Sequence, residues 1–117
     1  MRHIEEDIQS ACIQWFDLQF PAFRNILYAI PNGGKRNIRE AARLKKNGVR
    51  AGISDLILLR SNGVYNSLCI EMKAPGGKQT EKQKEWQRLA EHNGNKYVVC
   101  HSLDEFMSEV NEYIKQK

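Results

Sequence analysis

Two acidic side chains and one lysine stand inside sequence runs that are otherwise apolar. Asp55 lies in the run 53–60, and Glu71 and Lys73 lie in the run 65–73. An ionised carboxylate within a buried strand costs free energy unless it is paired or binds a metal ion. Because Glu71 and Lys73 are two residues apart, a strand places both side chains on the same face of its sheet. The two runs therefore predict a charged site built into neighbouring strands.

Two acids and a lysine that converge in this way suit the hydrolysis of a phosphodiester bond. Carboxylates can hold Mg²⁺, which polarises the phosphate and lowers the pKa of an attacking water, while the ammonium group stabilises or orients the anionic groups. The competing interpretation is a structural ion pair of Lys73 with Asp55 or Glu71. For an isolated pattern of this kind we favour the ion pair, because these residue types are common and the spacing is permissive.

The turn at 61–64 decides whether Asp55 and Glu71 share a face of the sheet. An even loop centred on Asn62 and Gly63 sends the two carboxylates to opposite faces, whereas an odd loop or a bulge brings them together. We expect the second arrangement, for instance a three-residue loop 61–63 with Gly63 in the left-handed conformation. The reason is that two buried carboxylates on one face can share a cation.

The elements that position these residues follow from apolar periodicity and turn residues. They predict the order helix, strand, helix, strand, strand, helix, strand, helix. The helices are expected at 4–18, about 36–47, 80–93 and from 102 onwards, and the strands at 24–30, 53–60, 65–73 and 96–100. Strand 96–100 should run parallel to strand 65–73, because a helix crosses over between them. The expected fold class is α/β, a mixed central sheet flanked by helices, in a single domain spanning 1–117.

Several helix ends carry specific signals. Thr80 and Ser102 each begin a capping-box sequence, and Gly48 stands where a left-handed helix cap is favoured. Gly48 and Gly52 also flank Arg50 just before the strand that carries Asp55, and glycine lets the backbone approach a phosphate closely. We give similar weight to two interpretations of these glycines: a plain helix cap followed by a turn, and a close approach to a phosphate.

The overall composition favours polyanionic partners. The chain has 18 Lys and Arg against 14 Asp and Glu, a net charge of +4 and a pI near 9.1, although a solvated cationic surface is the default for such a balance. Cys12, Cys69 and Cys100 lie far apart among apolar residues, which predicts reduced thiols in the core, and no Cys or His pair has zinc-ligand spacing. No run resembles a signal peptide or a membrane span, so we expect a cytoplasmic protein without membrane association.

Five motifs along the chain occur in the order of a known family. They are Glu5-x-x-Ile8-Gln9, Pro31-Asn32-Gly33-Gly34, Gly48-Val49-Arg50-Ala51-Gly52-Ile53-Ser54-Asp55-Leu56, Ile70-Glu71-Met72-Lys73, and Gln83. With these motifs the chain resembles the VRR-NUC family of the wider PD-(D/E)XK nuclease superfamily. The resemblance extends from the first helix to the strand at Tyr97. Ser54 departs from the proline that the family usually has before the aspartate.

The resemblance implies a restriction-endonuclease-like core and a nuclease that depends on Mg²⁺, for which Mn²⁺ should substitute. Asp55, Glu71 and Lys73 correspond to the signature triad, and Glu5 corresponds to the acid on the first helix that completes the metal site. The expected metal ligands are therefore Asp55, Glu71, Glu5 and the backbone carbonyl of Met72. A solvated charge in the first helical turn is the alternative for Glu5. Lys73 as general base or as transition-state stabiliser, and one metal ion or two, both stay open.

The remaining family glutamine and the basic residues carry alternatives as well. Gln83 corresponds to a glutamine near the active site, and its role in a capping box with Thr80 is nearly as probable. A basic stretch over the second helix and its exit suits phosphate contacts that position DNA, with a solvated helix face as the alternative. The expected DNA contacts are Asn32, Lys35, Arg36, Lys45, Lys46 and Arg50. Trp15 and Trp86 lie on helical apolar stripes and are expected in the core.

Stand-alone members of this family resemble homodimeric phage or bacterial enzymes that cut four-way DNA junctions. A symmetric junction needs paired incisions, which a twofold dimer can supply. The sequence therefore predicts a dimeric, structure-selective DNA endonuclease, located in the bacterial host cell if a phage encodes it. The alternatives are a flap endonuclease, a site-specific endonuclease on the same core, and a non-catalytic DNA-binding module whose acids balance Lys73.

Overall fold

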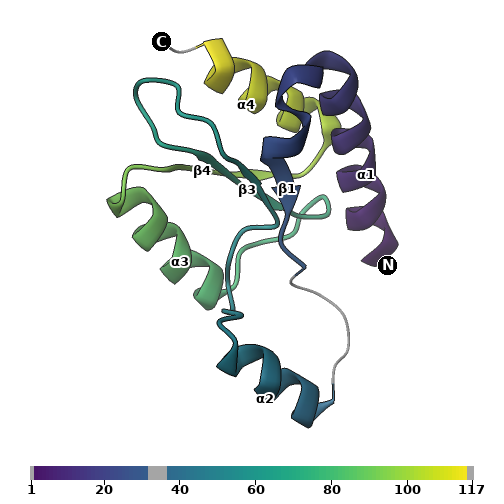
Figure 1. Cartoon of the computed structure of the whole chain (residues 1–117). Helices are drawn as coiled ribbons and strands as arrows, with labels where there is room; N and C mark the ends of the chain where they lie inside the picture. Colours follow the sequence, from purple (N-terminus) through teal and green to yellow (C-terminus); the bar gives the residue numbers. More distant parts are fainter. Residues whose placement is uncertain (1, 32–36, 116–117) are drawn as a thin grey trace.

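The computed structural model describes residues 2–31 and 37–115. The predicted order of helices and strands is confirmed, with one additional 3₁₀ helix, η1. The elements are α1 (Arg2–Gln19), η1 (Pro21–Ile26), β1 (Leu27–Ala29), α2 (Ile38–Lys46), β2 (Leu56–Leu58), β3 (Leu68–Met72), α3 (Glu81–His92), β4 (Lys96–Cys100) and α4 (Leu103–Lys115). Together they form an α/β fold with a mixed central sheet flanked by helices (Figure 1).

The four strands are ordered β1-β2-β3-β4 across the sheet. β1, β2 and β3 pair antiparallel, and β3 pairs with β4 in parallel, as the crossover through α3 predicts. In the register of β2 and β3, Leu56 faces Ile70 and Leu58 faces Leu68. One step beyond the paired residues, this register brings Asp55 opposite Glu71.

Alternate residues of each strand face different layers. Leu68, Ile70 and Met72 of β3 belong to the main core, where α1 and α4 contribute Phe16 and Phe106. The residues between them point to the opposite face of the sheet, which packs against α3. There Cys69 and Tyr97 pack with Ala90 and the partly buried Trp86. Because side chains alternate along a strand, Asp55, Glu71 and Lys73 must all lie on the α3 side.

The other predictions for core residues hold. The three cysteines are all buried and free. Trp15 is partly buried against the main core, with its ring edge-on to Phe20 at 5.8 Å and to Phe106 at 6.0 Å. Both tryptophans therefore pack against core clusters, as their helical stripes predicted. No helix within the described residues has the length and apolar character needed to cross a bilayer.

The predicted strand 24–30 is wrong in its first half, because residues 21–26 form η1 and only Leu27–Ala29 form a strand. Pro21 opens η1 at a position where a missing N–H has no cost. Phe23 then stacks on Phe20 with ring centroids 6.2 Å apart and lies under the Arg60 guanidinium at 4.2 Å. These aromatic contacts favour the tight turn over an extended chain. β1 pairs only where β2 lies alongside it.

The predicted strands 53–60 and 65–73 are also longer than the observed ones, since a loop at 59–67 separates β2 from β3. Asn62 organises this loop: its Oδ1 accepts hydrogen bonds from the backbone N–H groups of Val64 (2.9 Å) and Tyr65 (2.7 Å). Its amide also donates to the carbonyl of Tyr113 at 3.0 Å. Gly63 is left-handed as predicted (φ +89°), but the three-residue loop is wrong. The loop nevertheless has an odd number of residues, which confirms the predicted parity.

The helix ends match most of the predicted signals. Thr80 forms a complete capping box with Gln83 at the start of α3. At α4, Ser102 accepts a hydrogen bond from the Glu105 N–H (3.1 Å), but the Glu105 carboxylate binds the His101 N–H (2.6 Å) instead of completing a box with Ser102. The second box is thus only half formed, because the backbone N–H one residue earlier is the better placed donor.

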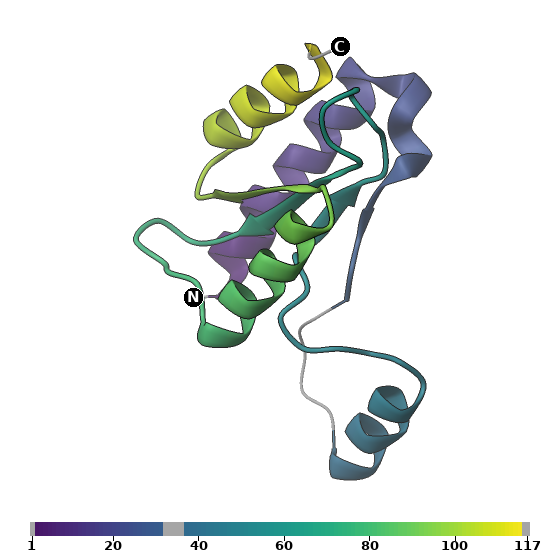
Figure 2. The same ribbon diagram turned by 90° about the vertical axis from the view of Figure 1, so that its left-hand side faces the viewer.

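α2 stands away from the sheet, below it in Figure 1 and again in Figure 2. None of residues 38–46 is buried. Asn37 caps its start by accepting a hydrogen bond from the Glu40 N–H (2.7 Å), and Gly48 (φ +105°) lies just beyond its end, as predicted. The predicted start at Arg36 lies outside the described residues. With no buried residue, α2 is held mainly by its own hydrogen bonds.

Candidate active site

Asp55 and Glu71 lie side by side at the end of β3. The sheet register places them opposite each other, and the backbone N–H of Met72 donates to Asp55 Oδ2 at 2.8 Å. This hydrogen bond fixes the Asp55 carboxylate against the strand that carries Glu71. Glu71 is only 2% exposed, whereas Asp55 is half-buried and opens onto a cleft. The structure thus brings the two predicted carboxylates together.

The proximity of the two acids has a strong electrostatic effect. Burial, followed by the charge of Asp55 and a hydrogen bond with it, raises the pKa of Glu71 from 4.5 to about 8. Lys73 opposes these effects, since its ammonium nitrogen lies 3.9 Å from Glu71 Oε2. The lysine therefore compensates only part of the negative charge, and a divalent cation would lower the remaining cost of ionising Glu71.

Gln83 connects α3 to this carboxylate pair. Its side-chain Nε2 donates to Glu71 Oε2 at 3.0 Å, while its Oε1 accepts a hydrogen bond from the Thr80 N–H at 2.9 Å. The capping box and the active-site contact were alternative interpretations of this residue. One side chain serves both at once, because its amide has a donor end and an acceptor end.

Gly52 sets the distance between the site and the first turn of α3. A Cβ atom at Gly52 would lie 2.5 Å from the carbonyl oxygen of Lys82, and its φ of +85° is left-handed. The close approach at Gly52 is therefore made to the backbone of α3. Ser54, next to the triad, is fully buried and donates its hydroxyl to the Leu56 carbonyl at 3.1 Å. These contacts hold the strand entry that carries Asp55.

The remaining question is how Glu5 and the other predicted metal ligands lie relative to the two carboxylates. Glu5 is half-buried in the first turn of α1, and its charge is the weakest of the influences that raise the pKa of Glu71. Within residues 2–31 and 37–115, no three His, Cys, Asp or Glu side chains already converge as a metal site. Two adjacent carboxylates still fit Mg²⁺, which commonly takes one or two of them and completes its shell with water and phosphate oxygens. Glu5 and the Met72 carbonyl stay predicted ligands.

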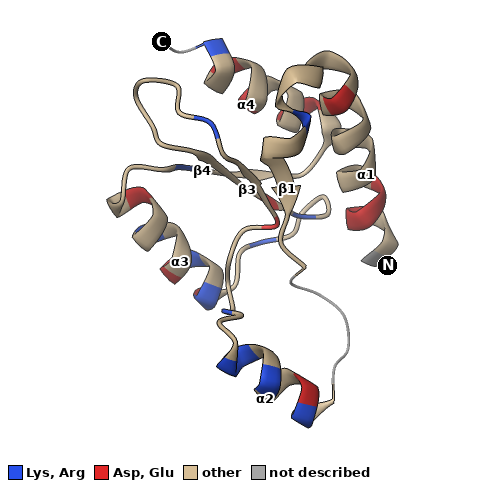
Figure 3. Ribbon diagram, in the orientation of Figure 1, with Lys and Arg blue, Asp and Glu red and all other residues tan. Residues whose placement is uncertain are grey.

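A cleft of about 920 Å³ opens beside Asp55, between α3 and the segment that runs from α2 to β2. Lys45 and Arg50 line it, whereas Lys46 is exposed outside it. Most of the charged positions of α2 are basic, and its ribbon accordingly carries more blue than red in Figure 3. Asn32, Lys35 and Arg36, the other predicted DNA contacts, lie outside the described residues. Two of the predicted cations thus line the same cleft as Asp55.

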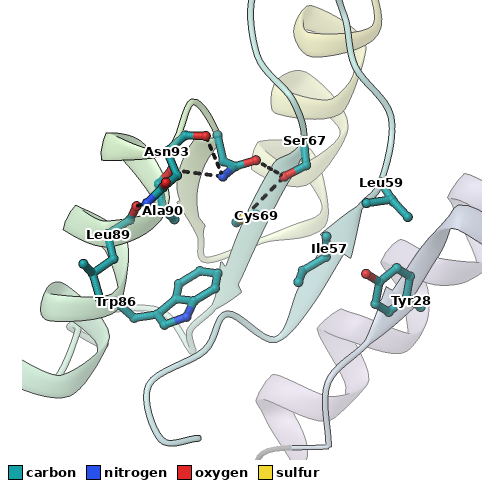
Figure 4. A pocket seen from close by; sticks show the side chains of 10 residues that line it. Tyr28, Ile57, Leu59, Ser67, Cys69, Trp86, Leu89, Ala90 and Asn93 are labelled. Atoms are coloured by element: carbon teal, nitrogen blue, oxygen red, sulfur yellow. Dashed lines mark hydrogen bonds between the residues drawn. The ribbon is translucent and has the colours of Figure 1, made fainter.

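A second, smaller hollow of about 370 Å³ lies on the same face of the sheet. Figure 4 shows Tyr28, Ile57 and Leu59 on one side of it and Trp86 and Leu89 on the other. Among the residues that line it in the described chain, none is acidic or basic. This hollow therefore lacks the groups that the predicted chemistry needs.

Three residues of the site were not anticipated from the sequence. Lys82 lines the larger cleft next to Gln83. The Tyr97 hydroxyl lies 3.5 Å from Glu71 Oε1, and Gln79 donates to that hydroxyl at 3.2 Å. A lysine adjacent to Gln83 was the available signal for Lys82. For Tyr97, the signal was a phenol on the strand predicted to pair with the Glu71 strand.

Comparisons with known proteins agree with this geometry. The family model of the VRR-NUC domain matches residues 3–104. A solved structure of a "VRR_NUC domain protein" superposes with a TM-score of 0.84 at 29% sequence identity, covering 96% of this chain and 88% of that chain. No curated protein matches the chain. The chain therefore belongs to the VRR-NUC family, a family of the nuclease type.

Proposed function

We propose that this chain is a divalent-metal-dependent DNA endonuclease that is selective for branched DNA, in particular four-way junctions, and acts as a homodimer. The observation that carries the proposal is the pairing of Asp55 with Glu71 on one face of the sheet, with Lys73 at 3.9 Å from the same Glu71 carboxylate. A DNA-binding module with no catalytic role has no need for a buried acid, Glu71, beside a second acid whose charge raises the cost of ionising it.

Each residue of the site has a distinct task in this proposal. Asp55 and Glu71 would hold Mg²⁺ or Mn²⁺, with Glu5 and the Met72 carbonyl as further ligands. The bound ion supplies Lewis acidity toward the phosphate and lowers the pKa of the attacking water. Lys73 stabilises negative charge that develops at the phosphate, or takes a proton from the water. Both roles require an ammonium or amine near the reacting group.

The surroundings of the site suit a phosphate backbone. Lys45 and Arg50 line the cleft beside Asp55, and Arg50 donates to the Lys45 carbonyl at 3.4 Å, which links the end of α2 to the strand entry. Such cations position DNA without reading its sequence. A symmetric four-way junction also needs two cuts related by symmetry, and two copies of this small chain would provide them.

Cleavage of a four-way junction by the wild type and by Glu71→Gln tests the proposal. The wild type should cut in Mg²⁺ or Mn²⁺, and the variant should bind the junction but lose cleavage. Linear duplex and flap DNA of the same sequence are the controls for selectivity. Cuts at fixed sites in linear DNA would indicate a site-specific enzyme, and faster flap cleavage would indicate a flap endonuclease. No cleavage of any DNA by the wild type in either metal would refute the enzyme.

A further inference from the structure

The Glu71 carboxylate is held at both of its oxygens, and by different elements. Oε2 receives Gln83 Nε2 from α3 and lies near Lys73. Oε1 receives the hydroxyl of Tyr97 from β4 at 3.5 Å, near the long limit of a hydrogen bond. Tyr97 is 7% exposed, so water has little access to compete for this contact.

Gln79 determines where the Tyr97 proton points. The Gln79 side-chain Nε2 donates to the Tyr97 oxygen at 3.2 Å and also donates to Gln87 Oε1 at 2.8 Å. With both of its N–H groups used as donors, Gln79 can only present a donor to the phenol. The hydroxyl proton of Tyr97 is therefore left for Glu71 Oε1.

The chain of hydrogen bonds continues to the surface. Gln87 Nε2 donates to Glu91 Oε2 at 3.0 Å, which fixes the orientation of the Gln87 amide and, through it, that of Gln79. In this series Tyr97 donates to Glu71, Gln79 donates to Tyr97 and Gln87, and Gln87 donates to Glu91.

We propose that Tyr97, oriented by Gln79, is a positioning residue that holds Oε1 of Glu71 and thereby sets the direction in which this carboxylate faces the divalent ion. The inference rests on the proposed function, because it assumes that Glu71 is a metal ligand. Hydrogen-bonding partners of ligating carboxylates commonly affect metal affinity by about 10- to 100-fold. Catalytic hydrogen bonds that are long without ligand also tighten in the complex, which agrees with the 3.5 Å separation.

Tyr97 also packs as a side chain, with its ring 6.1 Å from that of Trp86, so a test must separate packing from hydrogen bonding. Tyr97→Phe removes the hydroxyl and keeps the ring. Tyr113→Phe is the matched control, because Tyr113 is a fully buried tyrosine whose hydroxyl donates to the Arg60 carbonyl on the other side of the sheet. Both variants lose the hydrogen bond that a buried phenol donates, and only Tyr97→Phe loses it at Glu71, together with the bond that Gln79 donates to the phenol.

Mn²⁺ affinity of the full chain, measured calorimetrically without DNA, is the deciding quantity. Tyr97→Phe should weaken Mn²⁺ binding about 10-fold or more, and Tyr113→Phe should leave it within about 2-fold of the wild type. Gln79→Leu should shift the affinity in the same direction as Tyr97→Phe, because the phenol proton is no longer directed to Glu71. The Mn²⁺ concentration for half-maximal cleavage should rise in parallel, with DNA affinity unchanged.

The outcomes separate this inference from the proposed function. Unchanged Mn²⁺ affinity in Tyr97→Phe, or an equal loss in Tyr113→Phe, overturns the positioning role and leaves the nuclease intact. A wild type that binds Mn²⁺ but cuts no DNA overturns the nuclease, while the comparison of the two variants still decides the role of Tyr97. A wild type that binds no Mn²⁺ overturns both.

Discussion

Without metal, the Glu71→Gln variant should become increasingly more stable than the wild type as the pH rises. The folded chain holds the Glu71 proton up to a pKa of about 8, whereas the unfolded chain releases it near the ordinary value of 4.5. Stability that the protonated carboxyl contributes is therefore complete below pH 4.5 and is lost as the pH rises to about 8. At about 1.4 kcal/mol per pKa unit, this difference corresponds to about 5 kcal/mol. This is a large effect, because the whole free energy of unfolding of a small domain is only about 5–15 kcal/mol.

The assay is urea unfolding of the wild type and Glu71→Gln between about pH 4 and pH 9, with a chelator present. Glutamine has nearly the same shape and carries no charge, so the variant should gain stability relative to the wild type by up to about 5 kcal/mol across this range. Mg²⁺ added at the alkaline end should restore much of the wild-type stability and leave the variant unchanged. A difference that stays flat with pH, within about 1 kcal/mol, would refute the electrostatic reasoning.

Three further predictions concern the elements around the site. Gly52→Ala and Gly48→Ala both place alanine at positive φ, and each should lower the free energy of unfolding by about 1 kcal/mol. Only the alanine at position 52 meets the Lys82 carbonyl, so Gly52→Ala should lose about 1–3 kcal/mol more of this free energy and most of the cleavage activity. Equal unfolding free energies for these two variants would show that α3 does not depend on this contact. Thr80→Ala should cost about 1 kcal/mol of stability and leave cleavage nearly intact, whereas Gln83→Ala should also lower cleavage about 10-fold or more. Cleavage rates that fall equally in both would assign Gln83 to capping alone. Lys45→Ala should reduce the salt dependence of DNA binding, measured by fluorescence anisotropy, by about one released counterion, and an unchanged slope would exclude a phosphate contact.

Much of the fold could be predicted because it depends on local signals. The Thr80 capping box, the glycine at position 48 and the apolar periods of α1, α3 and α4 are properties of short segments, and all are present. The parallel pairing of β3 and β4 followed from the crossover rule. Strand lengths and the η1 turn could not be predicted this way, because they depend on which partner lies alongside and on the contact of Phe23 with Arg60.

The active-site residues divide in the same way. Charge within apolar runs and the two-residue spacing of Glu71 and Lys73 marked Asp55, Glu71 and Lys73 as candidates, but on that pattern alone a structural ion pair was favoured. The resemblance of five motifs to the VRR-NUC family named them as a triad. Tertiary structure alone decided that Asp55 shares a face with Glu71 and Lys73, because this depends on the register in which β2 and β3 pair across the loop 59–67. Asn62 ties that loop to α4 through the Tyr113 carbonyl. Tertiary structure also decided that Gln83 serves two contacts at once and that Tyr97 reaches Glu71. Such contacts join residues far apart in the chain, and their geometry exists only once the sheet register and the approach of α3 have been fixed by packing.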